Sequence, residues 1–415
     1  MPHTPRLVLL TALLVGLPTY WALPEGLSDW RSVAIVSGWL GCGLLLANLL
    51  FAIREPWLAR QLGGLENMYR WHHWLGLAAY LVLLCHPLAL ALDAWSEHPG
   101  QAWAVLAPLQ QGWPGWLGWL SLLCLMIGMG SALMPGTAYS TWRWLHGLLA
   151  LAILLSVGHL FALGLDFPLL WSPVLALAFI LWRIIRADCG VAAKPFVVSE
   201  VCSPGKDIVE VHLTPLAHPI EARPGQFVLA AFFDGPHFQG CREFHPFTIS
   251  ALGSDGELAL GIKALGDCTH HLQSLEPGVR ARIQGPFGAF LSEPASGPAL
   301  WIAGGIGITP FLARLRAGPP VHPVRLVYLY RSGPDAAYLD ELRRYEQTWA
   351  DFSLTARESG NAPPSFADIL PVPDAWRHWH CYLCGPPGLV VSAVNYLSGQ
   401  GVPGRQIHFE RFDFR

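Results

Sequence analysis

The chain has 415 residues, of which 53% are hydrophobic and 13% charged, and its mean hydropathy is +0.38. A soluble domain usually carries about 25% charged residues, so this composition favours a protein embedded partly in a membrane and excludes a disordered chain. The formal net charge of -3, without a basic run, argues against a nucleic-acid binder.

The charged residues are distributed unevenly along the chain. No lysine precedes Lys194, whereas the sequence after it has the composition of an ordinary soluble protein. The change falls near Arg186–Ala193. We therefore predict a transmembrane domain over residues 1–190, followed by two soluble domains over 191–295 and 296–415.

Six apolar segments of the first half are each long enough to cross a bilayer, which takes about 20 mostly apolar residues. They are roughly Leu7–Leu23, Ser32–Ile53, Trp71–Leu92, Trp113–Leu133, Trp142–Leu163 and Phe167–Ile185. The first could instead be a signal peptide, although its bulky residues Tyr20 and Trp21 make a poor cleavage site. The pattern predicts a six-helix transmembrane bundle.

Basic residues predict the orientation of this bundle. With the N-terminus inside, seven arginines face the cytoplasm and only Arg31 lies outside. We therefore expect a multi-pass protein of the inner or plasma membrane whose soluble domains are cytoplasmic.

Placing a histidine inside the membrane costs free energy, so a histidine there indicates a function by default. His72 and His86 lie 14 residues apart on the third span, within about 40° of one face and about 21 Å apart along the axis. His146 and His159 lie 13 residues apart on the fifth span, which runs in the same direction. This spacing suits two bis-histidine metal centres at two depths, and imidazole is an ordinary axial ligand of haem.

Two points about these histidines stay open. A step of 13 residues rotates by about 220°, which turns His159 away from His146 on a straight helix. Buried hydrogen bonding or helix capping is the alternative for each of the four, and His73 is the alternative ligand to His72.

The soluble half begins with short β-rich segments separated by clusters of Gly, Pro and Asp. They are Phe196–Val201, Ile208–Leu213, Gln226–Phe233, Phe247–Ser250, Leu258–Ile262 and Val279–Ile283. This pattern predicts an antiparallel β-barrel or sandwich.

From Pro298 onward strands alternate with helices, which is typical of an α/β nucleotide-binding domain with a parallel sheet. The expected strands are Ala299–Ala303, Val324–Tyr330 and His380–Leu383, and the expected helices begin near Pro310 and cover Ala336–Gln347 and Gly388–Leu397. The glycine-rich segment Ala303–Pro310 follows a strand and opens a helix, so it suits a pyrophosphate. Because Pro310 stands where the dinucleotide fingerprint has Gly or Ala, a purely structural turn is the alternative.

Nine cysteines in a chain whose second half reads as intracellular do not predict a disulfide framework. Cys381 and Cys384 form a Cys-x-x-Cys motif, but without a second pair a zinc site is disfavoured.

Six short motifs follow one another in the soluble half: His245–Ser250, Ile262–Thr269, Gly285–Gly288, Gly304–Pro310, Leu383–Pro387 and Phe409–Phe414. Together with the segment His72–Gly76 and the other intramembrane histidines, they resemble the ferric reductase and NADPH oxidase family. The soluble half of that family is of the ferredoxin–NADP reductase type. The resemblance covers nearly the whole chain, with the motifs in family order, and implies an FAD-binding β-barrel followed by an NAD(P)-binding α/β domain.

The resemblance also implies roles for single residues. The FAD-binding segment would comprise His245, Pro246, Phe247, Thr248, Ile249 and Ser250, with Lys263, Gly266 and Thr269 on the pyrophosphate. The nicotinamide nucleotide would contact Gly304, Gly305, Gly307, Thr309, Pro310, Cys384, Gly385 and Pro386.

Three of the implied positions would be catalytic. Thr248 would hydrogen-bond near the reactive flavin nitrogen, Cys384 would lie beside the nicotinamide, and Phe414 would cover the flavin. Phe247 would stack on the flavin ring, and His245 would face its phosphate or ribityl chain. The alternatives are that Phe247 belongs to the strand core, that Cys384 is merely buried, and that Phe412 and Phe414 pack the terminal segment.

The implied function is transmembrane electron transfer. Electrons would pass from NAD(P)H through FAD and two b-type haems, at His72/His146 and His86/His159, to a ferric chelate or dioxygen outside. Arg331 and Arg357 follow strand segments where they could bind a 2′-phosphate, which favours NADPH over NADH. The alternative is a membrane subunit that donates electrons to a periplasmic redox partner, and a non-redox transporter or receptor is a third, distant possibility.

Overall fold

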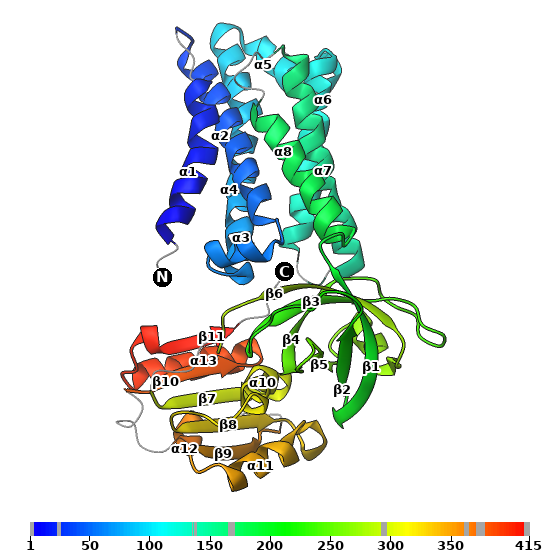
Figure 1. Cartoon of the computed structure of the whole chain (residues 1–415). Coiled ribbons are helices and arrows are strands. Elements are labelled where there is room, and N and C mark those ends of the chain that lie inside the picture. Colours follow the sequence, from blue (N-terminus) through cyan, green and yellow to red (C-terminus); the bar gives the residue numbers. More distant parts are fainter. Residues whose placement is uncertain are drawn as a thin grey trace. The chain divides into compact units, whose positions relative to one another are not determined.

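A computed structural model of the chain describes residues 4–22, 26–134, 136, 139–164, 171–291, 297–360, 365–370 and 378–410. The chain divides into two compact units, Met1–Cys189 and Gly190–Arg415 (Figure 1). We refer to them as the membrane unit and the reductase unit.

The membrane unit is built from long apolar helices. They are α1 (Thr4–Trp21), α2 (Asp29–Phe51), α4 (Leu65–Glu97), α6 (Trp113–Leu133), α7 (Tyr139–Ala162) and α8 (Trp171–Trp182). Short segments join or extend them: α3 (Pro56–Gln61), α5 (Pro99–Leu106), η1 (Pro108–Gln110) and the π-helix η2 (Arg183–Asp188). Within the described residues, α2, α4, α6 and α7 are long and apolar enough to cross a membrane. The membrane bundle is therefore confirmed, whereas the predicted count of six spans is confirmed only for these four.

Helix packing in this unit depends on small residues. A Cβ atom on Gly41 of α2 would lie 2.4 Å from Leu83 of α4, and one on Gly128 of α6 would lie 2.5 Å from Leu149 of α7. Glycine at these positions lets the paired helices approach closely, as small residues commonly do between membrane helices. Large apolar side chains such as Leu88, Leu123 and Trp144 point outward and are exposed, as expected of a surface that faces lipid.

The reductase unit begins with a closed antiparallel barrel, which confirms the predicted β-domain. Its strands are β1 (Lys194–Gly205), β2 (Ile208–Pro215), β3 (Phe227–Phe232), β4 (His245–Leu252), β5 (Leu258–Lys263) and β6 (Arg280–Phe287), in the order β1-β2-β5-β4-β3-β6. Alternate residues such as Phe196, Val211 and Leu260 fill its core. A short helix α9 (Asp267–His271) and the 3-10 turn η3 (Leu272–Ser274) follow β5.

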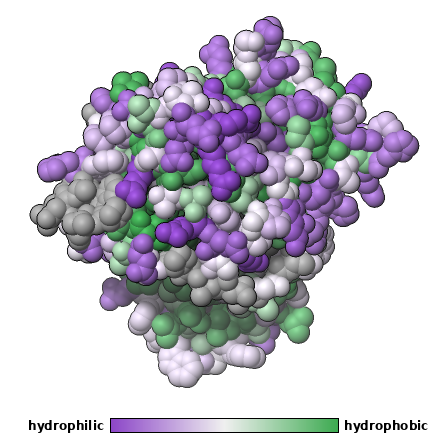
Figure 2. All heavy atoms as spheres, turned by 90° about the horizontal axis from the view of Figure 1, so that it is seen from below, coloured by the Kyte–Doolittle hydropathy of each residue, from purple (hydrophilic) through white to green (hydrophobic). Residues whose placement is uncertain are grey.

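A parallel five-stranded sheet completes this unit and confirms the predicted α/β domain. Its order is β11-β10-β7-β8-β9, with β7 (Ala299–Gly304), β8 (Val324–Tyr330), β9 (Phe352–Glu358), β10 (His380–Cys384) and β11 (Ile407–Glu410). The helices are α10 (Thr309–Arg316), α11 (Leu339–Thr348), α12 (Phe366–Ile369) and α13 (Pro387–Gly399), with 3-10 turns η4 (Gly305–Ile308), η5 (Gly333–Asp335) and η7 (Gly404–Gln406). The membrane helices expose large apolar side chains. The face of the molecule seen in Figure 2, in contrast, consists mostly of hydrophilic residues.

A partly buried ion network ties the barrel to the α/β domain. Arg316 of α10 donates hydrogen bonds to Glu210 of β2 (2.7 Å) and to Glu341 of α11 (2.8 Å), and Ser250 of β4 donates to Glu210 (2.5 Å). Burial alone would lower the pKa of Arg316, but its bonds to Glu341 and Glu210 outweigh that effect and raise it. The guanidinium therefore stays charged and holds three elements together.

Candidate functional site

The four intramembrane histidines lie on α4 and α7, and the structure brings them together as the two predicted pairs. The ring centroids of His72 and His146 are 6.2 Å apart, with an angle of 64° between the rings. His86 and His159 lie on the same two helices, near enough to influence each other electrostatically. His73, the alternative ligand, instead packs edge-on against Trp74.

Three of these histidines direct Nδ1 to a backbone carbonyl of a neighbouring helix. The Nδ1 atom of His72 is 3.1 Å from the oxygen of Asn48, that of His86 is 2.7 Å from Ala34, and that of His159 is 2.7 Å from Pro114. A carbonyl oxygen can only accept, so Nδ1 carries the proton and Nε2 keeps its lone pair. This second-sphere contact is the usual one for a histidine that binds a metal.

The fourth histidine has a different environment. The ring of His146 stacks on Trp142 at a centroid distance of 4.9 Å. Within the described part of the chain, its Nδ1 atom is buried without a hydrogen-bond partner. The ring is therefore positioned by stacking and by its pairing with His72.

Several residues that support the histidines were missed by the sequence reasoning. The side-chain amide of Asn48 donates to the backbone carbonyl oxygen of His72, a proposed ligand. A Cβ atom on Gly38 would lie 3.0 Å from the His86 ring, and one on Gly118 would lie 3.1 Å from the His159 ring. The hydrogen bond to Pro114 of α6 orients the His159 ring. The asparagine and the glycines on the neighbouring spans were the only features of the sequence that could have indicated these supporting contacts.

The predicted flavin segment lies on β4, whose residues alternate in direction. Phe247 and Ile249 belong to the barrel core, and Phe247 is only 7% exposed. Its ring therefore fits the alternative of a core residue better than flavin stacking. Ser250 is fully buried and donates its hydroxyl to Glu210, so the geometry gives it a structural role instead of the predicted contact with the cofactor. Thr248 lies between these two residues, does not belong to the barrel core cluster, and is itself only 6% exposed.

The first residue of this segment lies beside a carboxylate. His245 begins β4, and its Nε2 atom is 3.6 Å from the carboxylate of Glu243. Pro246, the next residue, is half-buried.

The second predicted flavin segment is a turn that its own threonine closes. The Thr269 hydroxyl accepts hydrogen bonds from the backbone N–H groups of Leu265 and Gly266, each at 2.9 Å, at the start of α9. A disulfide joins Cys268 in this turn to Cys241 in the connection before β4. The sequence reasoning expected no disulfide framework and missed this single bridge, because a separation of 27 residues gives no spacing signal.

The two predicted nucleotide motifs pack directly on each other at the carboxyl ends of β7 and β10. A Cβ atom on Gly307 would lie 2.4 Å from the carbonyl oxygen of Cys384, and one on Gly304 would lie 2.9 Å from Pro386. Gly385 is equally close to Gly304. The strand order reverses between β7 and β10, and in open α/β sheets ligands bind at such a switch point.

Other residues of the glycine loop shape it or approach it. Gly305 has φ of 55°, which favours glycine, and a Cβ atom there would lie 3.9 Å from the Lys263 ammonium. The Thr309 hydroxyl donates to the Ile306 carbonyl oxygen at 2.9 Å, and Pro310 stands in the first turn of α10. Thr309 therefore stabilises the turn, while Lys263 brings positive charge to it.

The cysteines of the Cys-x-x-Cys motif belong to different cores. Cys384 is buried in the core on one side of the sheet and Cys381 in the core on the other. Burial raises the pKa of Cys381 to about 12. The two thiols therefore cannot share a metal, and only Cys384 lies at the nucleotide crevice.

Positive charge collects after β8. A hydrogen bond from Ser332 lowers the pKa of Asp335, and the charges of Lys263, Lys206 and Arg331 lower it further. Arg331, Lys206 and Lys263 are therefore close enough to Asp335 for their charges to act on it, and the role of Arg331 in nucleotide binding stays a prediction. Phe414 lies outside the described residues.

Two family models match the chain. The ferric reductase like transmembrane component matches residues 37–157, and an FAD-binding domain matches residues 194–286. The first range contains His72, His86 and His146 and ends two residues before His159. The second contains the barrel strands up to β6.

Curated relatives match the chain over about half its length. The propane 2-monooxygenase reductase component of Rhodococcus jostii is 30% identical over 229 residues, which are 50% of this chain and 60% of that protein. The toluate 1,2-dioxygenase electron transfer component of Pseudomonas putida is 28% identical over 203 residues (46% and 58%). The flavohemoprotein of Pseudomonas aeruginosa is 26% identical over 250 residues (56% and 60%). The chain thus spans about 60% of the length of these relatives.

Solved structures also match about half of this chain. The flavohem-like FAD/NAD binding domain of nitric oxide dioxygenase from Vibrio cholerae is 21% identical and covers 53% of this chain and 98% of its own, with a TM-score of 0.45. The cytochrome b5 reductase domain of Ulva prolifera nitrate reductase is 17% identical and covers 52% and 97%, with a TM-score of 0.44. The transmembrane family model lies on the histidine-bearing helices and the FAD model on the barrel, so the chain combines a ferric reductase like transmembrane component with an FAD-binding domain, as its resemblance to the ferric reductase and NADPH oxidase family implies.

Proposed function

We propose that the chain carries electrons from NADPH or NADH through FAD and two b-type haems to an acceptor across the membrane, either a ferric chelate or dioxygen. The observation that carries this proposal is the arrangement of the four histidines. They form two pairs between α4 and α7, and three of them direct Nδ1 to a backbone carbonyl so that Nε2 remains available to a metal.

The residues present fit haem. An iron bound by two imidazole nitrogens at about 2 Å each would hold the ring centroids roughly 6 Å apart, and the His72 and His146 centroids are 6.2 Å apart. His72 and His146 would hold one haem, and His86 and His159 the other. The glycines beside His86 and His159 leave room for the rings to keep these positions.

FAD accepts two electrons as a hydride and can release them singly, and haem iron takes one electron at a time. The chain's own residues position these groups. Thr248, which does not belong to the barrel core cluster, offers a hydroxyl, and Lys263 brings an ammonium group toward the phosphates. Gly304, Gly307 and Gly385 shape the crevice at the ends of β7 and β10 that would receive the nicotinamide nucleotide. Cys384 lies at this crevice, and Phe414 remains a proposed cover for the flavin.

The donor and the orientation are also proposals. The positive charges of Arg331, Lys263 and Lys206 meet around Asp335, which favours a 2′-phosphate and therefore NADPH. The distribution of arginines between the loops, seven against Arg31 alone, supports a cytoplasmic reductase unit by the positive-inside rule. The acceptor would then be reduced outside.

The test is an anaerobic reduction of the purified full chain with bound FAD. After NADPH is added, haem absorbance should change to the reduced form. Rapid reoxidation by oxygen with release of superoxide identifies an oxidase, and rapid reoxidation by a ferric chelate alone identifies a ferric reductase. A slow response to both indicates a periplasmic redox partner as the acceptor, the alternative function. Absence of any haem band refutes the proposal.

Histidine variants test the assignment of the haem ligands. We expect His86→Ala and His159→Ala each to lose one haem per chain and to abolish external reduction, while NADPH still reduces the flavin. His73→Ala is the matched control, since this neighbouring intramembrane histidine packs on Trp74, and it should keep both haems. Two haems per chain in His86→Ala or His159→Ala would contradict the assignment.

A further inference from the structure

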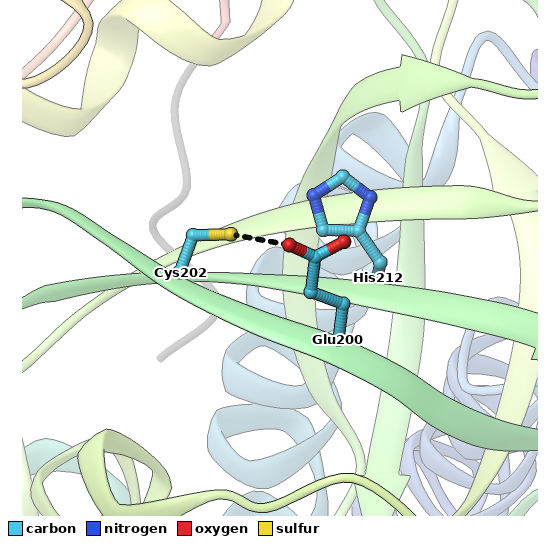
Figure 3. A group of neighbouring side chains, drawn as sticks. All are labelled: Glu200, Cys202 and His212. Carbon is cyan, nitrogen blue, oxygen red and sulfur yellow. Dashed lines mark hydrogen bonds between the residues drawn. The ribbon is translucent and has the colours of Figure 1, made fainter.

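Three side chains with different metal-binding atoms meet on the outside of the barrel. Figure 3 shows Glu200 and Cys202 of β1 beside His212 of β2. One ligand atom of each lies within 4.8 Å of those of the other two. The Cys202 thiol donates to Glu200 Oε1 at 3.3 Å. None of the three belongs to the flavin or nucleotide motifs.

The strand register explains why these residues share one face. Glu200 pairs with His212 and Cys202 with Glu210 in the antiparallel β1–β2 ladder. A register shift between Val198 and Glu200 leaves Ser199 without a partner in the ladder. An extra residue of this kind redirects the side chains that follow it. Val198 and Val201 therefore both pack toward the barrel core, while Glu200 and Cys202 face outward.

We propose that Glu200, Cys202 and His212 form a binding site for a single zinc ion. A thiolate, an imidazole and a carboxylate together suit a borderline-soft divalent metal rather than magnesium or calcium, which prefer oxygen ligands. Ligand atoms around tetrahedral zinc at about 2.0–2.3 Å lie roughly 3.3–3.8 Å from one another. The three side chains therefore need only small rotations to bind it, and the Cys202 thiol loses its proton to solvent on binding.

The surroundings of the cluster support a cation. The Glu210 carboxylate lies 3.7 Å from His212 Nε2 and is itself held by Arg316 and Ser250. Metal-binding histidines usually have a fixed carboxylate as such a neighbour. His212 and Cys202 are half-buried and Glu200 is exposed, so an ion can enter from solvent. Three protein ligands leave a fourth position for water, the arrangement of an accessible zinc site.

The test uses the full chain in detergent, freed of metal with a chelator. Zinc is titrated against a chromophoric competitor, and cobalt is used as a spectroscopic substitute. We expect one ion to bind per chain, and the cobalt form to show tetrahedral d–d bands together with a thiolate charge-transfer band. Absence of stoichiometric zinc binding, or a cobalt spectrum without the thiolate band, would overturn the site.

Variants separate this site from other thiols and imidazoles. Cys202→Ser and His212→Gln should remove the stoichiometric site, and Glu200→Gln should weaken it at least about tenfold, the scale reached even by residues that only support a ligand. Cys189→Ser, at an exposed cysteine outside the cluster, is the matched control and should leave zinc binding unchanged.

Retention of FAD and an unchanged unfolding midpoint without zinc check that each variant folds. If Cys202→Ser fails this check, alkylation of Cys202 in the unmodified chain decides the matter. Protection by zinc supports the site, and equal alkylation with and without zinc overturns it. Unchanged zinc affinity in a folded Cys202→Ser variant also overturns it.

Discussion

The two units satisfy their polar side chains in different ways. In the membrane unit, the histidines find backbone carbonyls of neighbouring helices, as His86 does with Ala34. In the reductase unit, polar side chains satisfy one another, as Arg316 does with Glu210 and Glu341. A membrane interior offers few polar partners and no water, so a polar residue there indicates function. In the reductase unit, a polar residue within a motif can equally serve the fold, as Ser250 does.

The largest effect should come from breaking the ion network of the reductase unit. Arg316→Met removes the cation and leaves Glu210, which is nearly inaccessible, without its charge partner. Breaking a buried ion pair costs about 3–5 kcal/mol, and we expect about 3 kcal/mol because Arg316 and Glu341 keep some contact with solvent. Chemical denaturation of the full chain, monitored by the release of flavin, measures this loss of unfolding free energy.

The control for this prediction lies on the same helix. Arg314→Met changes an arginine of α10 that takes no part in the network and should alter the free energy of unfolding by less than about 0.5 kcal/mol. Equal losses of unfolding free energy in the two variants would show that any positive charge on α10 stabilises the chain, and that the Arg316 network has no special role.

The second prediction concerns glycines that serve packing between motifs. Gly307→Ala would place a Cβ atom 2.4 Å from the Cys384 carbonyl oxygen, a backbone atom that cannot move without separating β10 from the glycine loop. We expect the KM for NADPH to rise at least about tenfold, equivalent to 1.4 kcal/mol, while FAD remains bound.

Steady-state kinetics with an artificial acceptor measure this change. Gly388→Ala is the matched control, because a Cβ atom on Gly388 meets nothing within 4 Å although the residue lies in the neighbouring motif region. An unchanged KM in Gly307→Ala would show that the close packing of the two loops is dispensable for nucleotide binding.

The barrel, the parallel sheet and the membrane helices could be predicted because their patterns are local. Alternation of apolar residues gives the strands, and apolar runs give α2, α4, α6 and α7. The histidine pairs could also be predicted, since spacing along a helix fixes depth. What could not be predicted depends on contacts between segments far apart in the chain. Examples are the Ser250–Glu210 hydrogen bond, the Cys241–Cys268 disulfide and the glycines beside His86 and His159.

The third prediction tests such a contact in the membrane unit. Gly118→Ala would place a Cβ atom 3.1 Å from the His159 ring, so the imidazole must tilt by a few tenths of an ångström. We expect the haem proposed at His86/His159 to be retained with a shifted reduction potential, because ligand orientation tunes the metal. Gly130→Ala on the same helix meets nothing within 4 Å and should leave the potential unchanged. A redox titration compares the two variants, and equal reduction potentials would show that Gly118 does not influence the proposed haem site.

The smallest effect is a pH dependence in the reductase unit. Burial would raise the pKa of Glu341, but its hydrogen bond with Arg316 outweighs burial and lowers that pKa below its ordinary value of 4.5. The stabilisation by the carboxylate is therefore complete above pH 4.5 and is lost as the pH falls through the lower, folded-state pKa. We expect Glu341→Gln to be about 1 kcal/mol less stable than the unmodified chain at pH 7. Below pH 4.5 this difference should shrink, as measured by denaturation at each pH.

Asp340→Asn, at an exposed carboxylate of the same helix, is the control and should show almost no difference in stability from the unmodified chain at any pH. A difference for Glu341→Gln that stays constant as the pH falls would mean that shape, rather than charge, makes Glu341 part of the Arg316 network.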